Sequence, residues 1–119
     1  MRLSEKQRGF TLMVTELVLF SYARGLELTL GEAYRTKEQQ ELHIKSGLSR
    51  VKHSRHQDRL AIDMNLFVDG AYVRDKERYR VLGEKWEALG GRWGGRFGVA
   101  PEDFEMRVGW DAGHFEYGG

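Results

Sequence analysis

Two of the four histidines in this sequence lie close to carboxylates. His56 is followed seven residues later by Asp63, and His114 stands between Asp111 and Glu116. Two histidines and one aspartate can hold a zinc ion through three protein ligands, which leaves the fourth tetrahedral position for water. Zinc lowers the pKa of that water enough to supply hydroxide near neutral pH, and a nearby carboxylate can accept its proton. The spacing alone also fits solvated or hydrogen-bonded structural residues, because a His-x6-Asp pair occurs often by chance.

The composition limits the kinds of site that the chain can build. Cysteine is absent, so disulfides and thiolate metal sites are excluded, and any transition metal depends on His, Asp and Glu. The 19 basic and 18 acidic side chains leave a formal charge of +1, so no overall field attracts nucleic acid or an anionic membrane. We therefore expect no nucleic-acid partner, and a metal-dependent nuclease is poorly supported. The length predicts one domain over residues 1–119.

The first apolar segment of the chain has helical spacing. It predicts a helix that begins at a capping box of Ser4 and Gln7 and ends at a left-handed Gly25. Residues 10–22 contain Glu16 and are too few to span a bilayer, so we expect no stable membrane insertion. The segment also lacks the plain apolar core of a secretory signal, which indicates synthesis without a signal peptide. The apolar positions at helical spacing are Phe10, Met13, Val14, Leu17 and Val18.

A strand and a second helix are predicted next. Residues 26–33 alternate between apolar and polar side chains, as in a half-buried strand, and Arg35 follows the end of this strand. Thr36 and Gln39 form a capping pair for a helix that stops near Gly47.

The clearest strand follows a polar loop predicted over residues 47–59. Residues 60–68 alternate strictly, and Asp63 lies on the less apolar of the two faces. Asp69-Gly70 is a strong signal for a two-residue hairpin, with residues 71–73 as the return strand.

The remaining residues predict one more helix and two more strands. An apolar stripe predicts the helix over residues 76–89, and a glycine-rich loop with aromatic residues follows over 90–98. Residues 104–110 and 114–117 are candidate strands. We expect an α+β fold in which helices pack on a small, mainly antiparallel sheet that carries the zinc site on its open face.

Several motifs of the sequence resemble those of a known family. Residues 54–63 read S-x-H-x6-D, and residues 111–116 read D-x-x-H-F-E. Residues 31–36 are similar to a G-x-R-type segment, and residues 93–95 look like a glycine-tryptophan loop. In this order, over about residues 28–116, they resemble the D-alanyl-D-alanine carboxypeptidase and L-alanyl-D-glutamate endopeptidase family of zinc peptidases, which includes phage endolysins.

The resemblance implies that one zinc ion is bound by His56, Asp63 and His114. Asp111 occupies the place of the family's catalytic carboxylate, where many relatives have the longer Glu. Asp111 can also be read as a residue that only caps its turn. Glu116 is then the alternative base and a candidate substrate contact, because it lies on the same strand face as His114.

Three further residues are assigned by the resemblance. It implies that Arg35 lies near the metal and stabilises the oxyanion or holds a substrate carboxylate, although a surface salt bridge is the plain alternative. Ser54 either hydrogen-bonds the substrate or orients its loop. Arg59 stands where family members commonly have Gly, and a left-handed backbone would be strained for Arg, so we expect this loop to differ locally.

The function implied by the resemblance is hydrolysis of the peptide stem of bacterial peptidoglycan. We favour an L-alanyl-D-glutamate-type endopeptidase of the endolysin kind. The alternatives are a D-alanyl-D-alanine carboxypeptidase and a non-catalytic zinc-bearing binding or structural module. An endolysin of this kind would be a monomer that is made in the bacterial cytoplasm and acts on the cell wall after release.

Overall fold

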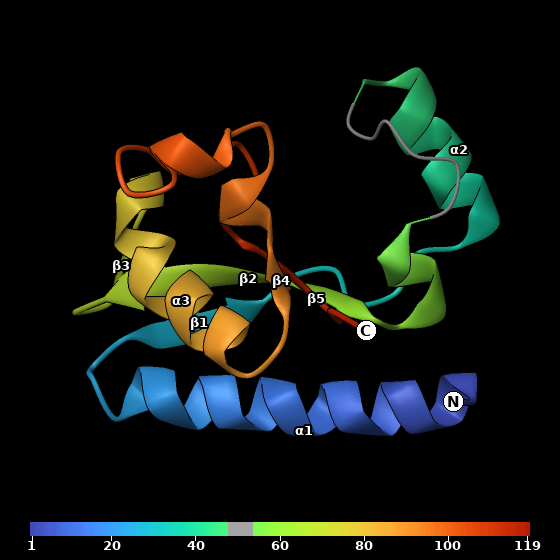
Figure 1. Cartoon of the computed structure of the whole chain (residues 1–119), viewed down its shortest axis with the longest axis horizontal. Helices are drawn as coiled ribbons and strands as arrows, with labels where there is room; N and C mark the ends of the chain where they lie inside the picture. The colour runs from blue at the N-terminus through green and yellow to red at the C-terminus, as the bar shows by residue number, and fades with distance from the viewer. Residues whose placement is uncertain (48–53) are drawn as a thin grey trace.

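Helices cover a small antiparallel sheet in the computed structural model, which describes residues 1–47 and 54–119 (Figure 1). The predicted α+β fold is confirmed. The loop predicted over 47–59 lies partly outside the described residues, and its last part forms the short 3-10 helix η1 (Arg55–Asp58). None of the helices in the described part of the chain has the length and apolar character needed to cross a bilayer.

The sheet has the strand order β1-β2-β5-β4, and every neighbouring pair is antiparallel. The long β2 is its centre, since β1 pairs with its second half and β5 pairs with its beginning. A short β3 pairs with the end of β2. The strands are β1 (Glu27–Leu30), β2 (Ala61–Val68), β3 (Ala71–Tyr72), β4 (Arg92–Trp93) and β5 (His114–Glu116).

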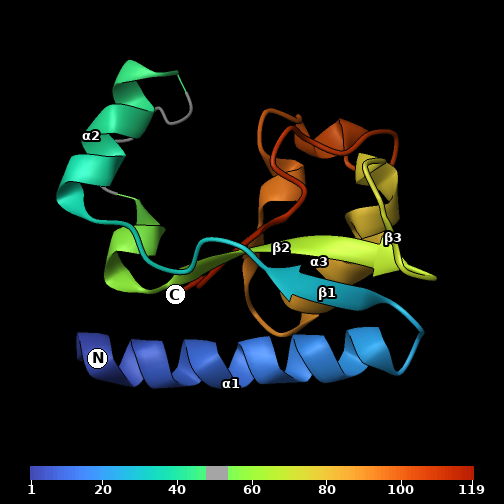
Figure 2. The same cartoon turned by 180° about the vertical axis from the view of Figure 1, so that it is seen from behind.

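Helix α1 (Leu3–Tyr22) runs along one side of the sheet in both views of the fold (Figures 1 and 2). Its buried face carries Phe10 and Leu17, which join the core beneath β2. The helix ends before Gly25, whose φ of 72° is the left-handed stop predicted from the sequence.

The capping box predicted at the start of α1 is wrong. The N-cap residue is Arg2, which makes no side-chain cap, and Ser4 lies inside the first turn. The Gln7 amide instead donates to the backbone oxygen of Asp58 at 2.8 Å. This tertiary hydrogen bond competes with the local cap and joins α1 to η1.

Two other local signals predicted turns correctly. Thr36 and Gln39 form a reciprocal capping box at the start of α2 (Lys37–Lys45). Asp69 and Gly70 have φ values of 51° and 78°, as a two-residue hairpin with the right-handed strand twist requires.

The core is built around two fully buried tryptophans. Trp86 lies on α3 (Arg80–Ala88), which follows the 3-10 helix η2 (Lys76–Tyr79) within the helix predicted over 76–89. Its ring meets Phe10 edge-on at 5.7 Å and Phe115 at 5.9 Å between centroids. Trp93 is equally buried and donates from its indole nitrogen to the backbone of Ala112 at 2.8 Å. These contacts hold α1, α3, β4 and β5 together.

The strand predicted over residues 104–110 does not form. This segment follows η4 (Pro101–Asp103) and continues in turns and irregular backbone, and the first carbonyl group of the segment is bound by side chains. The backbone oxygen of Phe104 accepts from Arg80 at 2.7 Å and from Arg96 at 3.2 Å. The start of this segment is therefore hydrogen-bonded by two arginine side chains and not by a neighbouring strand.

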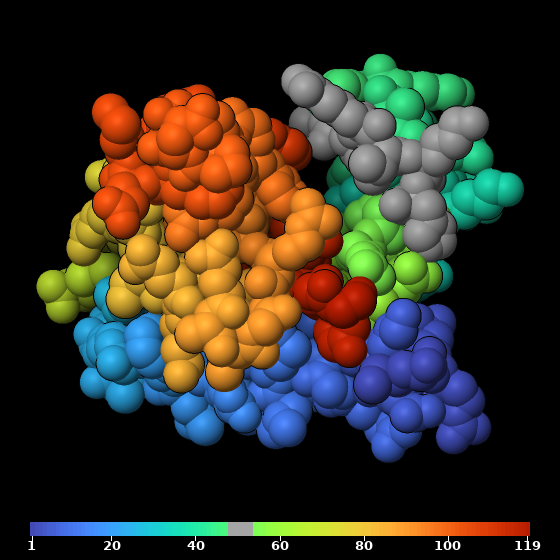
Figure 3. Space-filling view, in the orientation of Figure 1, coloured from blue at the N-terminus to red at the C-terminus, as the bar shows by residue number. Residues whose placement is uncertain are grey.

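Helix α2 stands away from the rest of the helices, on the side of the sheet where η1 lies (Figure 2). The η3 helix (Gly94–Arg96) and η4 lie on the same side of the sheet as α2, away from α1, but at the other end of the sheet (Figure 1). The surface is indented between the segment of η3 and η4 and the part of the chain that carries α2 and η1 (Figure 3).

Candidate metal centre

Strand pairing brings two of the candidate ligands face to face. In the antiparallel pair of β2 and β5, Asp63 is the direct partner of His114. Side chains at directly opposite positions point to the same face of a sheet, so the carboxylate and the imidazole meet. The separation of these two groups is therefore fixed by the sheet.

The third candidate, His56, is delivered by η1 just before β2. Ser54 caps η1 by accepting from the backbone N–H of His56 at 3.2 Å, while the Gln57 side chain accepts from the backbone N–H of Ser54 at 2.8 Å. Ser54 is itself buried. Of the two roles open from the sequence, its position favours orientation of the loop that holds His56.

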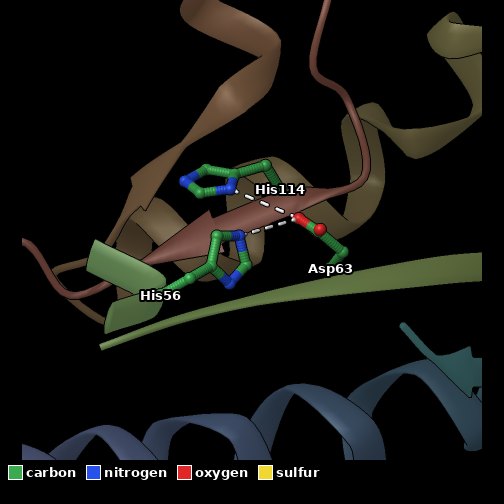
Figure 4. Close-up of side chains that lie close together, drawn as sticks. All are labelled: His56, Asp63 and His114. Atoms are coloured by element: carbon green, nitrogen blue, oxygen red, sulfur yellow. Dashed lines mark hydrogen bonds and ion pairs between the residues drawn. The ribbon is translucent and has the colours of Figure 1, made fainter. Parts of the chain in front are cut away.

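The three side chains converge on one point (Figure 4). Oδ1 of Asp63 lies 3.3 Å from Nε2 of His56 and 3.3 Å from Nδ1 of His114. One ligand atom from each residue lies within 4.8 Å of the others. Two imidazole nitrogens and one carboxylate oxygen are a donor set that suits zinc and leaves a position open. The residues therefore fit a bound metal ion.

The protonation of this cluster is set by its close packing. Burial alone would raise the pKa of Asp63, but hydrogen bonds from His114 and His56 hold it well below its usual range. Burial alone would lower the pKa of His114, yet its hydrogen bonds to Asp63 and Glu116 raise it to about 9. Without a metal, a proton on His114 therefore supplies the positive charge that a bound cation would otherwise place beside these carboxylates.

Glu116 lies behind the His114 ring. Its Oε1 is 2.8 Å from Nε2 of His114, on the opposite ring edge from the Nδ1 that faces Asp63. The carboxylate is buried, and although burial alone would raise the pKa of Glu116, the His114 hydrogen bond lowers it. A carboxylate in this position fixes the ring and its tautomer. This position favours orientation of His114 over the base or substrate contact expected from the sequence.

Asp111 lies on the ligand side of the same ring. Its Oδ2 is 3.8 Å from Nδ1 of His114, and its side chain is 35% exposed, so it reaches both the cluster and solvent. Burial raises the pKa of Asp111, while the charge of His114, and to a smaller extent those of His56 and Arg35, act in the opposite direction. A carboxylate with a raised pKa beside a metal position suits proton transfer.

Arg35 is buried beside the cluster and is held by two side chains that sequence reasoning missed. Its Nε donates to Glu32 at 2.5 Å, and its Nη1 donates to Gln40 at 2.5 Å. The backbone N–H of Arg35 donates to the oxygen of His56 at 3.2 Å. In place of the surface salt bridge considered as an alternative, Arg35 therefore makes a partly buried one with Glu32.

Arg59 does adopt the left-handed conformation, with φ 55° and ψ 40°, although the sequence led us to expect a different local backbone because this conformation is strained for Arg. Its guanidinium lies over the Tyr34 ring at 4.1 Å from the centroid. The left-handed conformation costs about 1–2 kcal/mol, and a cation–π contact of about 0.5–1 kcal/mol offsets part of that. The Arg59 N–H also bonds the oxygen of His56 at 3.2 Å.

The aromatic residues near the cluster have different roles. Trp93 is in the core, whereas Trp110 is 59% exposed. The Phe97 ring lies between Trp110 and the site, 5.9 Å from Trp110 and 5.5 Å from His114 between centroids. Trp110 is therefore not a core residue, and its ring packs on Phe97, which in turn contacts the His114 ring.

Comparison with known proteins agrees with this geometry. Residues 48–117, more than half of the chain, match the family of peptidases described as D-alanyl-D-alanine carboxypeptidase. The chain belongs to this family. The family resemblance read from the sequence motifs is thus confirmed, and the matched residues include all three candidate ligands.

One curated relative in this comparison is the L-alanyl-D-glutamate peptidase of Listeria phage A118. The two are 38% identical over 85 residues, which cover 67% of this chain and 30% of that protein. The match therefore spans less than a third of the length of this relative.

Solved structures with the same fold are also peptidases. The Serratia marcescens L-Ala D-Glu endopeptidase ChiX matches with a TM-score of 0.68 and 19% identity, over 98% of this chain and 86% of ChiX. The vancomycin resistance D,D-pentapeptidase VanY, solved in complex with Zn(II), matches with a TM-score of 0.60 and 22% identity, over 92% of this chain and 71% of VanY. These likenesses place the chain in the same fold.

In this member of the D-alanyl-D-alanine carboxypeptidase family, Gly94 allows η3 to approach the turn that carries Asp111 and His114. A Cβ at Gly94 would lie 2.1 Å from the Asp111 oxygen and 2.9 Å from the His114 Cβ. We expect Gly94→Ala to lower the free energy of unfolding by about 1–3 kcal/mol, measured by urea denaturation. Gly9→Ala is the control, since its added methyl has no neighbour within 4 Å and alanine favours the helix. Equal stability of the two variants would contradict the prediction.

The metal-free protein is expected to be most stable at mildly acidic pH. The raised pKa of His114 contributes stability that is complete below its ordinary value of 6.5 and is lost as the pH rises through about 9. The lowered pKa of Asp63 contributes stability that is lost as the pH falls below its ordinary value of 3.8. Urea unfolding with a chelator at pH 5.5, 7.5 and 9.5 should therefore show a decline of up to a few kcal/mol with rising pH. Zinc should abolish this decline, because metal binding replaces the proton.

Proposed function

We propose that the chain is a zinc-dependent peptidase that hydrolyses a peptide bond in the peptide stem of bacterial peptidoglycan. The observation that carries this proposal is the convergence of His56, Asp63 and His114, with Asp111 beside them on the ligand side of His114. Membership in a peptidase family and the names of the similar proteins support the substrate class.

The mechanism assigns a separate task to each side chain. Zinc, when bound, supplies a Lewis acid that polarises a carbonyl group and makes water a nucleophile near neutral pH. Asp111 would remove the proton of the attacking water and pass it to the leaving amine, a task for which its place beside the ligand atom of His114 is suited. The charge of Arg35 stabilises the oxyanion that develops on the substrate carbonyl. Glu116 keeps Nδ1 of His114 directed at the metal position.

We propose the L-alanyl-D-glutamate bond as the one that is cut. The phage relative and ChiX both carry the name of this activity, whereas the family description and VanY support the alternative of a carboxypeptidase. Purified peptidoglycan should be digested and the new termini identified by mass spectrometry. New D-glutamate amino termini are expected, and free D-alanine as the sole product would contradict this choice.

The site of action follows from the substrate. On this proposal the protein acts on the cell wall after release from the cytoplasm, and turbidity loss of cells with a permeabilised outer membrane would report that action. We further propose that the active form is a monomer without a nucleic-acid partner. Light scattering at working concentration tests the first statement, and a dimer would contradict it.

A further inference from the structure

Glu32 occupies a central place beside the candidate metal centre. Its backbone oxygen accepts from the Asp63 N–H at 2.9 Å, and the N–H of the preceding Gly31 donates to the Asp63 oxygen at 2.7 Å. These two bonds extend the antiparallel pairing of β1 and β2 beyond Leu30, the last β1 residue, and its partner Met64. The backbone of Glu32 is therefore fixed next to a metal ligand.

The Glu32 side chain faces both Arg35 and His56. One carboxylate oxygen, Oε1, accepts from the Arg35 Nε at 2.5 Å and pairs with its Nη2. The same oxygen is 4.0 Å from Nδ1 of His56. Glu32 is thus the carboxylate that lies between the buried cation and the first ligand.

The His56 ring needs an acceptor on this side. Its Nε2 faces Asp63, so a metal bound at Nε2 leaves the proton of the neutral ring on Nδ1. That atom is fully buried and has no hydrogen-bond partner within residues 1–47 and 54–119. A buried N–H without an acceptor is unfavourable, and metal-binding histidines almost always donate their second N–H to a carboxylate, a carbonyl or water.

The other histidine of the cluster already has this arrangement. His114 faces Asp63 with Nδ1 and meets Glu116 with Nε2 at 2.8 Å. Glu32 stands in the corresponding place for His56, one short side-chain movement away from contact. Each imidazole would then donate its second ring N–H, the one that does not face the metal position, to one glutamate.

We propose that Glu32 is a positioning residue. When metal is bound, its carboxylate accepts a hydrogen bond from Nδ1–H of His56, and it also holds Arg35 beside the site. This inference rests on the zinc-dependent function proposed above. Glu32 would thereby connect the ligand His56 to Arg35, because the same carboxylate oxygen contacts Arg35 and would accept from His56.

Zinc affinity of three variants tests this inference. Zinc dissociation constants would be measured on metal-free protein by competition with a chelating dye for the wild type, Glu32→Gln and Glu32→Ala. The glutamine amide oxygen can still accept the His56 proton, whereas alanine cannot. We expect Glu32→Ala to bind zinc about 10- to 100-fold more weakly and Glu32→Gln to stay within a few fold of the wild type. Glu41→Ala, an exposed change on α2, is the matched control and should bind as the wild type does.

The Nδ1 proton can also be observed directly. In ¹⁵N-labelled, zinc-loaded protein, the His56 Nδ1–H should give a slowly exchanging signal that persists in Glu32→Gln and is lost in Glu32→Ala. Equal zinc affinity of all variants, or an unchanged signal in Glu32→Ala, would overturn the inference and leave the zinc function intact. Equal weakening in Glu32→Gln and Glu32→Ala would also overturn it, because charge and not hydrogen bonding would then be responsible. A wild type that binds no zinc would overturn the proposed function itself.

Discussion

Asp111→Asn is expected to lower kcat by about 10²- to 10⁴-fold while zinc remains bound. The amide keeps the shape of the side chain but cannot accept the proton of the attacking water. Asp111 is also not needed as a ligand, because His56, Asp63 and His114 already converge without it. Release of soluble peptides from peptidoglycan would be followed by chromatography, with zinc content measured by mass spectrometry on the same samples.

The control for this change is Glu105→Gln, which removes an exposed carboxylate elsewhere on the surface and should keep full activity. Wild-type kcat in Asp111→Asn would exclude Asp111 as the base. If the wild type binds zinc and hydrolyses no wall preparation, the non-catalytic binding module is the better description, since such a module has no need of Asp111.

Asp63→Asn is expected to remove both zinc and activity. Both imidazoles face the same Asp63 oxygen at 3.3 Å, so this carboxylate balances the charge of the whole cluster. Loss of a supporting residue alone typically weakens metal binding about 10- to 100-fold, and loss of a charged ligand should exceed that. Zinc stoichiometry after dialysis and peptidoglycan hydrolysis are the two measurements.

A control variant on β2 separates the effect of removing the metal ligand from the effect of disturbing the strand. Asn65→Asp lies two residues further along β2 on the same side and places a carboxylate outside the cluster. It should keep zinc and activity. Stoichiometric zinc in Asp63→Asn would contradict the assigned ligand set.

Much of the fold follows from local chemistry that is visible in the sequence. The stop at Gly25, the capping box of Thr36 and Gln39, and the hairpin at Asp69-Gly70 all depend on residues adjacent in the chain. The features that were missed depend on distant partners. Arg80 satisfies the backbone at Phe104, where a strand was expected.

The candidate site was predicted to a similar extent. The resemblance of the sequence motifs to a known family singled out His56, Asp63 and His114, and the structure brings them together. No spacing rule connects Glu32 with His56, because that relation arises only when separate segments meet in the fold. Glu116 and His114 are two residues apart on β5, so the sequence placed them on one strand face, and the structure adds that the two side chains contact each other. Glu32 lies in the same Gly-Glu-Ala-Tyr-Arg segment as Arg35, and a carboxylate three residues before an arginine assigned to the site could have indicated a role for Glu32.

The meeting of β2 and β5 at the site also affects how the chain unfolds. Asp63 and His114 are 51 residues apart in the sequence, and the chain has no cysteine. A metal ion shared by these residues closes a long loop and acts as a removable cross-link. By the chain-entropy estimate used for disulfides, a loop of this length lowers the entropy of the unfolded chain by an amount worth about 4 kcal/mol. On the proposed function, the ion that serves catalysis would therefore also act as a cross-link that stabilises a small chain without disulfides.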